Sequence, residues 1–106
     1  VLPLSETHYN RGYSYAELGQ YQNAINDYTK AIQLDPVNAA AYTNRGTSYS
    51  RLGEYQTAIF DFNKAIEIKP SYAEAYNGRG EAYMALEDAA QAQLDFDKAK
   101  ELGYDP

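Results

Sequence analysis

The side chains that most often carry out chemistry in enzymes are scarce in this chain. It contains one histidine, His8, and no cysteine, which excludes a thiolate metal site, a cysteine nucleophile and disulfide bonds. His8 falls at a packing position of the first predicted helix, so we interpret it as a structural residue rather than a general base. Neighbouring acids such as Asp95 and Asp97 lack the glycine and closing glutamate of an EF-hand loop. The sequence therefore predicts no catalytic residue, no metal site and no cofactor, and we expect that the protein is not an enzyme.

Charged residues nevertheless recur at a fixed spacing of 34 residues. The two series are Arg11, Arg45 and Arg79, and Asp27, Asp61 and Asp95. Because a guanidinium group on a packed face favours a planar carboxylate as its partner, we interpret the six residues as an Arg–Asp ladder that connects helices. The alternative is two separately solvated series of charges. The spacing alone leaves open whether each pair forms within one repeat or between two repeats.

The same period organises the whole chain. Small and aromatic residues recur at Gly12, Gly46 and Gly80, at Ala24, Ala58 and Ala92, and at Tyr15, Tyr49 and Tyr83. Within each period, apolar residues follow the 3.6-residue spacing of two successive helices. We predict helices over residues 6–18, 22–34, 39–52, 56–68, 73–86 and 89–102. Because one helical hairpin cannot cover its own apolar face, three must stack to form a core. The predicted fold is all-α: one domain, 1–106, of three antiparallel hairpins with repeats at about 5–38, 39–72 and 73–106.

Several predicted helix ends carry recognisable signals. Asn38 is a suitable N-cap for the third helix, and Leu52 with Gly53 is a suitable end for it. Pro70 follows the fourth helix at a point where a helix cannot comfortably continue. These signals support the assignment of two helices to each repeat.

Composition limits the classes of partner. Nine basic and 15 acidic residues give a net charge of −6, which disfavours nucleic-acid binding because phosphate neutralisation needs an excess of Lys and Arg. No apolar run approaches the ~18 residues that span a bilayer, so no membrane partner is expected. The lack of cysteine leaves the compartment unknown, with only a weak preference for the cytoplasm. The chain opens at Val1 without a methionine, so we expect it to be a segment of a longer protein.

The second repeat carries the pattern of a known family at Tyr42, Gly46, Tyr49, Ala58, Phe62, Ala65 and Pro70. This pattern resembles the tetratricopeptide repeat (TPR) family, and the Asn-Arg-Gly triplet at 44–46 is similar to a type common in bacterial proteins. His8 stands in the aromatic position of the first repeat, and Tyr104 replaces the closing proline of the third. The resemblance implies a right-handed superhelix whose first helices line a concave groove. It also implies that the function is protein binding without chemistry.

The groove face of the first helices is predicted from their spacing. Its candidate binding residues are Tyr9, Asn10, Tyr13, Thr43, Asn44, Thr47, Arg51, Asn77 and Glu81. An asparagine amide offers a donor and an acceptor together, so Asn10 and Asn44 could hold a peptide backbone whatever its side chains. The face carries four glutamates and one arginine, a net charge of −3. We therefore expect a neutral or basic extended peptide as ligand, and we expect Asn44 itself to pack against little.

Co-chaperone members of the family grip a C-terminal carboxylate with lysines, asparagines and an arginine in this groove. The resemblance maps those positions to Tyr9, Tyr13, Asn44, Glu74 and Gly78. Only Asn44 matches the pattern, and the groove contains no lysine. The sequence therefore argues against an acidic chaperone tail as the ligand.

Two other functions stay open at this point: a self-associating scaffold, and an accessory domain of a larger enzyme. In the last predicted helix, Gln93 and Lys100 stand where the earlier repeats have isoleucine. Polar residues at these positions are typical of a terminal repeat whose outer face meets solvent. We therefore expect the array of repeats to end at this helix.

Overall fold

The computed structural model describes residues 3–106, which form six α-helices and no strand. The helices are α1 (Leu4–Glu17), α2 (Tyr21–Leu34), α3 (Ala39–Arg51), α4 (Tyr55–Ile68), α5 (Ala73–Ala85) and α6 (Ala89–Glu101). The six predicted helices are confirmed, and their ends lie within two residues of the predicted ones. No helix in this part of the chain is both long enough and apolar enough to cross a membrane.

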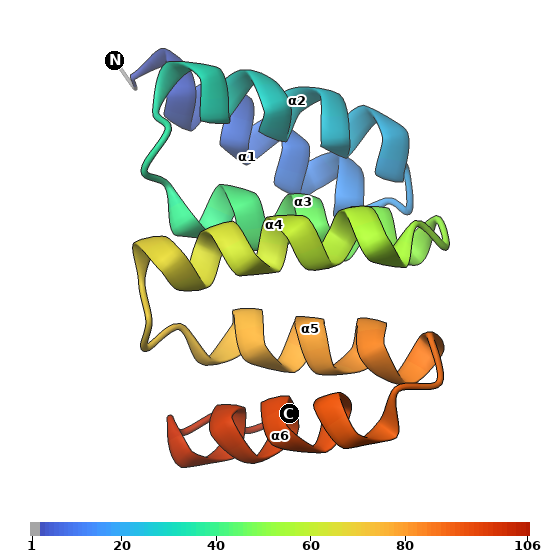
Figure 1. The fold of residues 1–106 in the computed structure, drawn as a ribbon. Helices are drawn as coiled ribbons and strands as arrows, with labels where there is room; N and C mark the ends of the chain where they lie inside the picture. The colour runs from blue at the N-terminus through green and yellow to red at the C-terminus, as the bar shows by residue number, and fades with distance from the viewer. Residues whose placement is uncertain (1–2) are drawn as a thin grey trace.

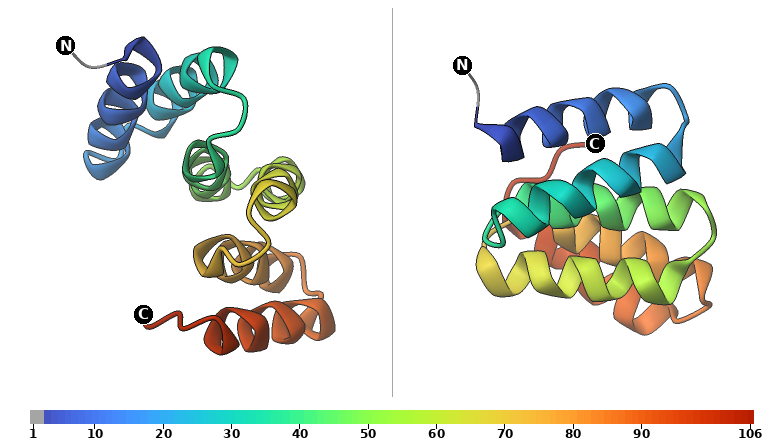
Figure 2. Two further views of the ribbon diagram at one scale, coloured as in Figure 1. Left: turned by 90° about the vertical axis from the view of Figure 1, so that its left-hand side faces the viewer. Right: turned by 90° about the horizontal axis from the view of Figure 1, so that it is seen from above.

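Consecutive helices pair into three hairpins that stack one on the next (Figure 1). Within the stack α2 packs against α3, and α4 packs against α5. The first helices α1, α3 and α5 also contact one another in succession. In the end-on view of Figure 2, α1 and α3 lie on one side of the array and α2 and α4 on the other. The molecule is elongated, 43 Å by 25 Å by 22 Å. Because the first helices contact one another in succession, they form one continuous face along it.

The predicted helix ends have the expected geometry. The side chain of Asn38 accepts a hydrogen bond of 3.0 Å from the backbone N–H of Ala41 and so caps α3. Gly53 follows α3 with φ of 81°, a left-handed conformation that a glycine adopts without a Cβ penalty. The third hairpin has Glu87 at the corresponding position, with φ of 63°. Helix α4 ends at Ile68, two residues before Pro70.

Each hairpin is held closed by an aromatic ring from its second helix that lies against a glycine of its first helix. A Cβ atom at Gly46 would lie 2.9 Å from Cε1 of Phe62, and one at Gly12 would lie 3.0 Å from Cδ1 of Tyr28. The distance at Gly46 is shorter than real Cβ contacts, and the distance at Gly12 is tighter than most of them. The ring therefore occupies space that any larger residue would need, and the 34-residue glycine series follows from this packing.

Every arginine of the Arg–Asp ladder pairs with the aspartate of its own repeat. The Nε and Nη2 atoms donate to the two carboxylate oxygens at 2.8 Å each for Arg11 and Asp27, at 2.9 and 2.8 Å for Arg45 and Asp61, and at 2.8 and 2.7 Å for Arg79 and Asp95. These bidentate pairs join the two helices of one hairpin.

The remaining nitrogen of two arginines reaches the preceding repeat. Nη1 of Arg45 donates to Oγ1 of Thr29 at 3.2 Å, and Nη1 of Arg79 donates to Oδ1 of Asn63 at 2.9 Å. Thr29 and Asn63 are equivalent residues of α2 and α4. Each of these arginines therefore joins three helices, and the ladder acts both within and between repeats.

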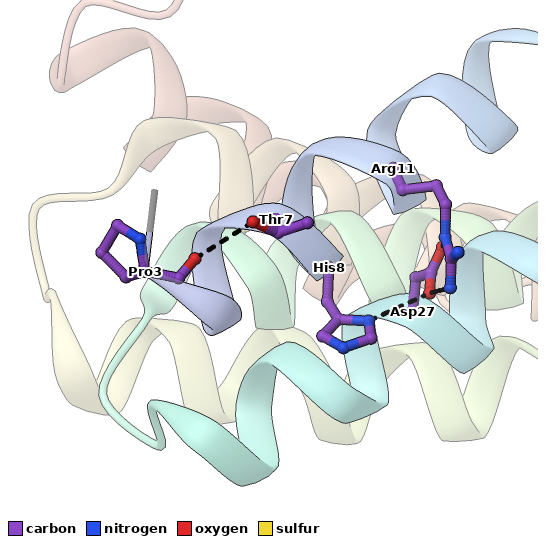
Figure 3. Close-up of polar contacts among 5 residues, drawn as sticks. All are labelled: Pro3, Thr7, His8, Arg11 and Asp27. Carbon is purple, nitrogen blue, oxygen red and sulfur yellow. Dashed lines mark hydrogen bonds and ion pairs between the residues drawn. The ribbon is translucent and has the colours of Figure 1, made fainter. Parts of the chain in front are cut away.

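The surroundings of the pairs differ along the array. The side chain of Arg11 is 62% exposed, whereas that of Arg45 is 15% exposed. Figure 3 shows the first pair, where Nδ1 of His8 also lies 3.4 Å from Oδ1 of Asp27. The hydrogen bonds from Arg11 lower the pKa of Asp27. Burial raises the pKa of Asp61, against the opposing effect of the hydrogen bonds from Arg45. The central pair is thus the one most dependent on its partner for solvation.

Replacing Arg45 with leucine should therefore lower the free energy of unfolding by about 3 kcal/mol, because Asp61 would stay buried without its partner. Adding Asp61→Ala should recover part of this loss, and the exposed pair should serve as the control, with a smaller effect for Arg11→Leu. Urea unfolding followed by circular dichroism measures these differences. Additive effects of Arg45→Leu and Asp61→Ala would contradict the account of the ladder.

The outer face of α6 is polar. Ile25 and Ile59 are buried where α2 and α4 meet the next repeat, but their counterpart Gln93 is exposed. Lys100 is likewise exposed, although its counterpart Ile32 is buried. The described structure thus presents a solvated surface at the end of the array.

If these two residues keep the face soluble, the double variant Gln93→Ile/Lys100→Ile should associate at tens of micromolar, because it would expose a surface like the internal ones. Sedimentation velocity across a concentration series measures the association. A double variant that sediments like the parent protein would show that α6 does not need a polar cap.

Candidate binding groove

The groove is the face formed by α1, α3 and α5. Among the predicted site residues, Asn10, Tyr13, Thr47, Arg51 and Glu81 are exposed, and Tyr9, Asn44 and Asn77 are partly buried. These side chains come from the three first helices, which lie next to one another. The described face can therefore be contacted by one ligand that crosses all three helices.

Thr43 is a correction to the predicted groove surface. Its side chain is buried at 3% exposure, and its Oγ1 atom has no hydrogen-bond partner. Helical spacing placed it on the groove face as if α3 were alone, but α3 has α1 on one side and α5 on the other. These neighbours cover Thr43, so it cannot contact a ligand directly.

Asn44 is tied to the neighbouring repeat. Its Nδ2 donates a hydrogen bond of 2.8 Å to the hydroxyl of Tyr9, which joins α3 to α1. The Tyr9 ring packs against Tyr28 with a centroid distance of 5.7 Å, and burial raises the pKa of the Tyr9 phenol. The expectation that Asn44 packs against little is therefore wrong. The bond fixes the amide in place and leaves its Oδ1 atom and one N–H for a ligand.

Two hollows lie along the groove, one on each side of α3. The first, about 320 Å³, lies between α1 and α3 and is named the tyrosine pocket for Tyr13, Tyr21 and Tyr28 in its wall. The second, about 200 Å³, lies between α3 and α5 and is named the phenylalanine pocket for Phe62. Sequence reasoning missed the contribution of the second helices, which supply Tyr21 and its equivalent Tyr55. The 34-residue spacing of these two tyrosines was the signal that could have revealed it.

Gly78 interrupts the asparagine series of the groove for a steric reason. A Cβ atom at this position would lie 2.6 Å from both Cε1 and Cζ of Phe62. The same ring also lies against Gly46, so it is enclosed between α3 and α5. A side chain at position 78 is therefore incompatible with the present position of Phe62.

The charges at the two pockets alternate along the groove. Glu17 lines the tyrosine pocket, Glu81 lines the phenylalanine pocket, and Arg51 lines both. Within residues 3–106 no carboxylate oxygen lies within 4.0 Å of the Arg51 guanidinium. Glu81 accepts a hydrogen bond of 3.1 Å from Asn77. No three His, Cys, Asp or Glu side chains in the described part of the chain are grouped closely enough to hold a metal ion.

Comparison with known families settles the class of the chain. The TPR repeat family matches residues 12–53, and the tetratricopeptide repeat family matches residues 39–72 and 73–102. The chain belongs to the tetratricopeptide repeat family. Members of this family are protein-interaction modules, so the partner of this TPR domain is a protein. No curated protein matches its sequence.

Solved structures of other TPR domains are closely similar to it. The first TPR domain of Spaghetti (RPAP3), bound to the HSP90 peptide SRMEEVD, is 35% identical with a TM-score of 0.92, over 94% of this chain and 79% of that one. The second TPR domain of human RPAP3, in complex with the HSP70 peptide SGPTIEEVD, is 31% identical with a TM-score of 0.89, over 94% and 83%. The Arabidopsis OM64 TPR domain is 34% identical with a TM-score of 0.93, over 94% and 83%.

The bond between Asn44 and Tyr9 can be measured through stability. Either Asn44→Ala or Tyr9→Phe should lower the free energy of unfolding by about 1 kcal/mol, because each removes one partly buried hydrogen bond. The two losses should not add in the double variant, since both remove the same bond. Thermal and urea unfolding of the four proteins give the coupling. Unchanged stability in both single variants would show that the bond does not contribute to the fold.

Proposed function

We propose that the groove of this TPR domain binds an extended segment of a partner protein, and that the segment is neutral or basic. The observation that carries the proposal is the position of Asn44 at the centre of the groove. Its amide is fixed by Tyr9 and keeps an acceptor and a donor free. A peptide backbone presents one donor and one acceptor per residue, so this amide can bind it without regard to sequence.

Asn10 extends the same kind of contact to the first repeat. It occupies on α1 the position that Asn44 occupies on α3, and its side chain is exposed. Tyr13, one turn further along α1, offers an exposed ring beside it. A ligand that crosses from α1 to α3 therefore meets two backbone-binding amides and one apolar surface.

The charge of the groove argues against acidic ligands. The TPR domains of RPAP3 were solved with peptides that end in EEVD. Of the five positions that correspond to the carboxylate-binding residues of co-chaperones, Asn44 alone matches, and the other four hold Tyr9, Tyr13, Glu74 and Gly78 here. Two of these residues are uncharged tyrosines and one is acidic. An arginine at position 78 would require the Phe62 ring to move.

Self-association is the weaker alternative for this domain. The stacking surface that the internal repeats use is polar on α6, where Gln93 and Lys100 are exposed. Groove binding does not depend on that surface. We therefore infer that the three repeats act as one domain whose working surface is the concave face.

Selection of ligands from a displayed random peptide library tests the proposal. The enriched peptides should be neutral or basic, and the acidic peptide SRMEEVD should show no saturable binding up to about 1 mM. Binding of the basic ligands should weaken with added salt because the attraction to the groove is screened. Enrichment of acidic peptides with a free C-terminal carboxylate would overturn the proposed ligand class.

The same selected peptide tests the role of Asn44. Asn44→Ala should cost about 1–3 kcal/mol of binding free energy, measured by isothermal titration calorimetry. Asn26→Ala provides the matched control, because Asn26 is an exposed asparagine on α2, away from the groove. A peptide that binds the Asn44→Ala protein as tightly as the parent would place the binding surface elsewhere.

A further inference from the structure

We propose that the tyrosine pocket and the phenylalanine pocket are neighbouring side-chain subsites, which accept two cationic side chains of one extended segment. The two cationic residues stand three positions apart, with lysine or arginine at each. This inference rests on the proposed function and adds the side chains that the groove selects. It follows from the repeat symmetry, the charges and the spacing of the two pockets.

The pockets are built from equivalent residues. Tyr21 and Tyr55 begin the second helices of their repeats and line one pocket each. Tyr28 and Phe62 stand one repeat apart and line the same two pockets. Arg51 belongs to both, once on each side of α3. The same aromatic framework is therefore presented twice to a ligand that crosses the first helices, with the charged residues at different positions of the wall.

The tyrosine pocket has the chemistry of a cation site. The carboxylate of Glu17 and the rings of Tyr13 and Tyr21 contribute to its wall. A guanidinium or ammonium group gains from the carboxylate charge and from the electron-rich faces of the rings together. The stem of a long cationic side chain also covers apolar surface on its way into the hollow.

The phenylalanine pocket also offers a carboxylate and a ring, but its carboxylate comes from a different position of the repeat. Glu81 corresponds to Thr47 of the tyrosine pocket, and the position of Glu17 is held here by Arg51. Glu81 and Tyr55 supply its carboxylate and its ring. Gly78 lines it without a side chain, where the tyrosine pocket has Asn44. Because the Phe62 ring fills the space beside Gly78, a side chain of the ligand enters the hollow beside Glu81 and Tyr55 instead.

Arg51 determines which ligand residues can lie between the two subsites. One guanidinium faces two pockets that carry one glutamate each, so the pair of pockets has a net charge of −1. Within the described residues Arg51 has no carboxylate partner. A backbone carbonyl of the ligand satisfies it, whereas a cationic side chain directly above it is repelled. The ligand pattern is therefore a cation, a neutral stretch over Arg51, and a second cation.

The repeat geometry sets the spacing of the two cations. The two pockets lie on opposite sides of α3, so about one helix diameter, roughly 10 Å, separates them. A polyproline II segment advances ~9 Å in three residues and returns its side chain to the same side. In a β-strand, by contrast, the side chains of residues i and i+3 would point to opposite sides. Cationic residues at positions i and i+3 of a polyproline II segment thus reach both pockets.

Capped twelve-residue peptides rich in proline and alanine provide the probe. They carry two arginines separated by two, three or four positions, and a fourth peptide has glutamine at both positions. Fluorescence anisotropy at low salt should show the tightest binding for the spacing of three, by about fivefold over the other spacings. Equal affinity at all three spacings would overturn the two-subsite inference and leave only a diffuse attraction of positive charge.

Protein variants assign the pockets. Glu17→Gln and Glu81→Gln should each weaken binding about three- to tenfold, and Glu74→Gln should have a smaller effect. Glu74 is the matched control because it is an exposed glutamate of α5 that lines neither pocket, and its replacement changes the net charge equally. An effect of Glu74→Gln as large as that of the other two variants would contradict the inference.

Removing the arginines of the peptide one at a time completes the test. Two further peptides each keep one of the two arginines. Glu17→Gln should weaken the binding of one of these peptides and leave the affinity of the other unchanged, and Glu81→Gln should show the opposite pattern. Failure of this pattern overturns the paired subsites. If library-selected peptides still lose affinity in Asn44→Ala, the proposed groove function stands without them. If those peptides are insensitive to Asn44→Ala, the groove function itself fails.

Discussion

An aromatic ring enclosed between backbones sets the geometry of this domain, and the middle ring has the widest consequences. Phe62 reaches from α4 to lie against Gly46 of its own hairpin and Gly78 of the next one. A ring in this place fixes how closely α3 and α5 approach, because neither glycine can be enlarged without moving it. The same ring lines the phenylalanine pocket. One packing contact thus determines the hairpin, the junction between repeats and part of the groove.

The arginines connect the packed helices through directional hydrogen bonds. Two nitrogens of Arg45 hold Asp61 within the hairpin, and the third reaches Thr29 of the preceding repeat. A buried pair of this kind contributes more to register than to net stability, because desolvation offsets much of the attraction. The first arginine, Arg11, has no preceding repeat in the described structure and is largely exposed. The position of a repeat in the array therefore decides how much its arginine is buried.

Much of the fold could be predicted because the period of 34 residues repeats local signals three times. Asn38, Gly53 and Pro70 mark helix ends through backbone chemistry that depends on few neighbours. The pairing within each repeat could not be predicted, because Asp61, 16 residues after Arg45, and Asp27, 18 residues before it, fit the repeat period equally well. The burial of Thr43 and the bond between Asn44 and Tyr9 depend on contacts between first helices. Helical periodicity treats each helix alone and does not contain such contacts.

The groove combines a backbone-binding amide with a charge pattern that is unlike a carboxylate clamp. The Asn44 amide is held by Tyr9 but keeps one N–H and its oxygen free for hydrogen bonds. Arg51 stands between two glutamates and has no ion pair with either within 4.0 Å. Polar groups left without partners on an exposed concave face are suited to a ligand that supplies them. The exposed side chains of Phe60 and Leu94 belong to α4 and α6, whereas the groove is formed by α1, α3 and α5.

The most direct test of the central claim is a heteronuclear NMR titration that observes the side-chain amide of Asn44 and the Nε–H of Arg51. Addition of a neutral or basic ligand selected from the library should shift both signals along one saturable curve. The backbone signals of Phe60 and Leu94 should stay in place. Saturable shifts at Phe60 and Leu94, with the Asn44 and Arg51 signals unmoved, would contradict binding in the groove.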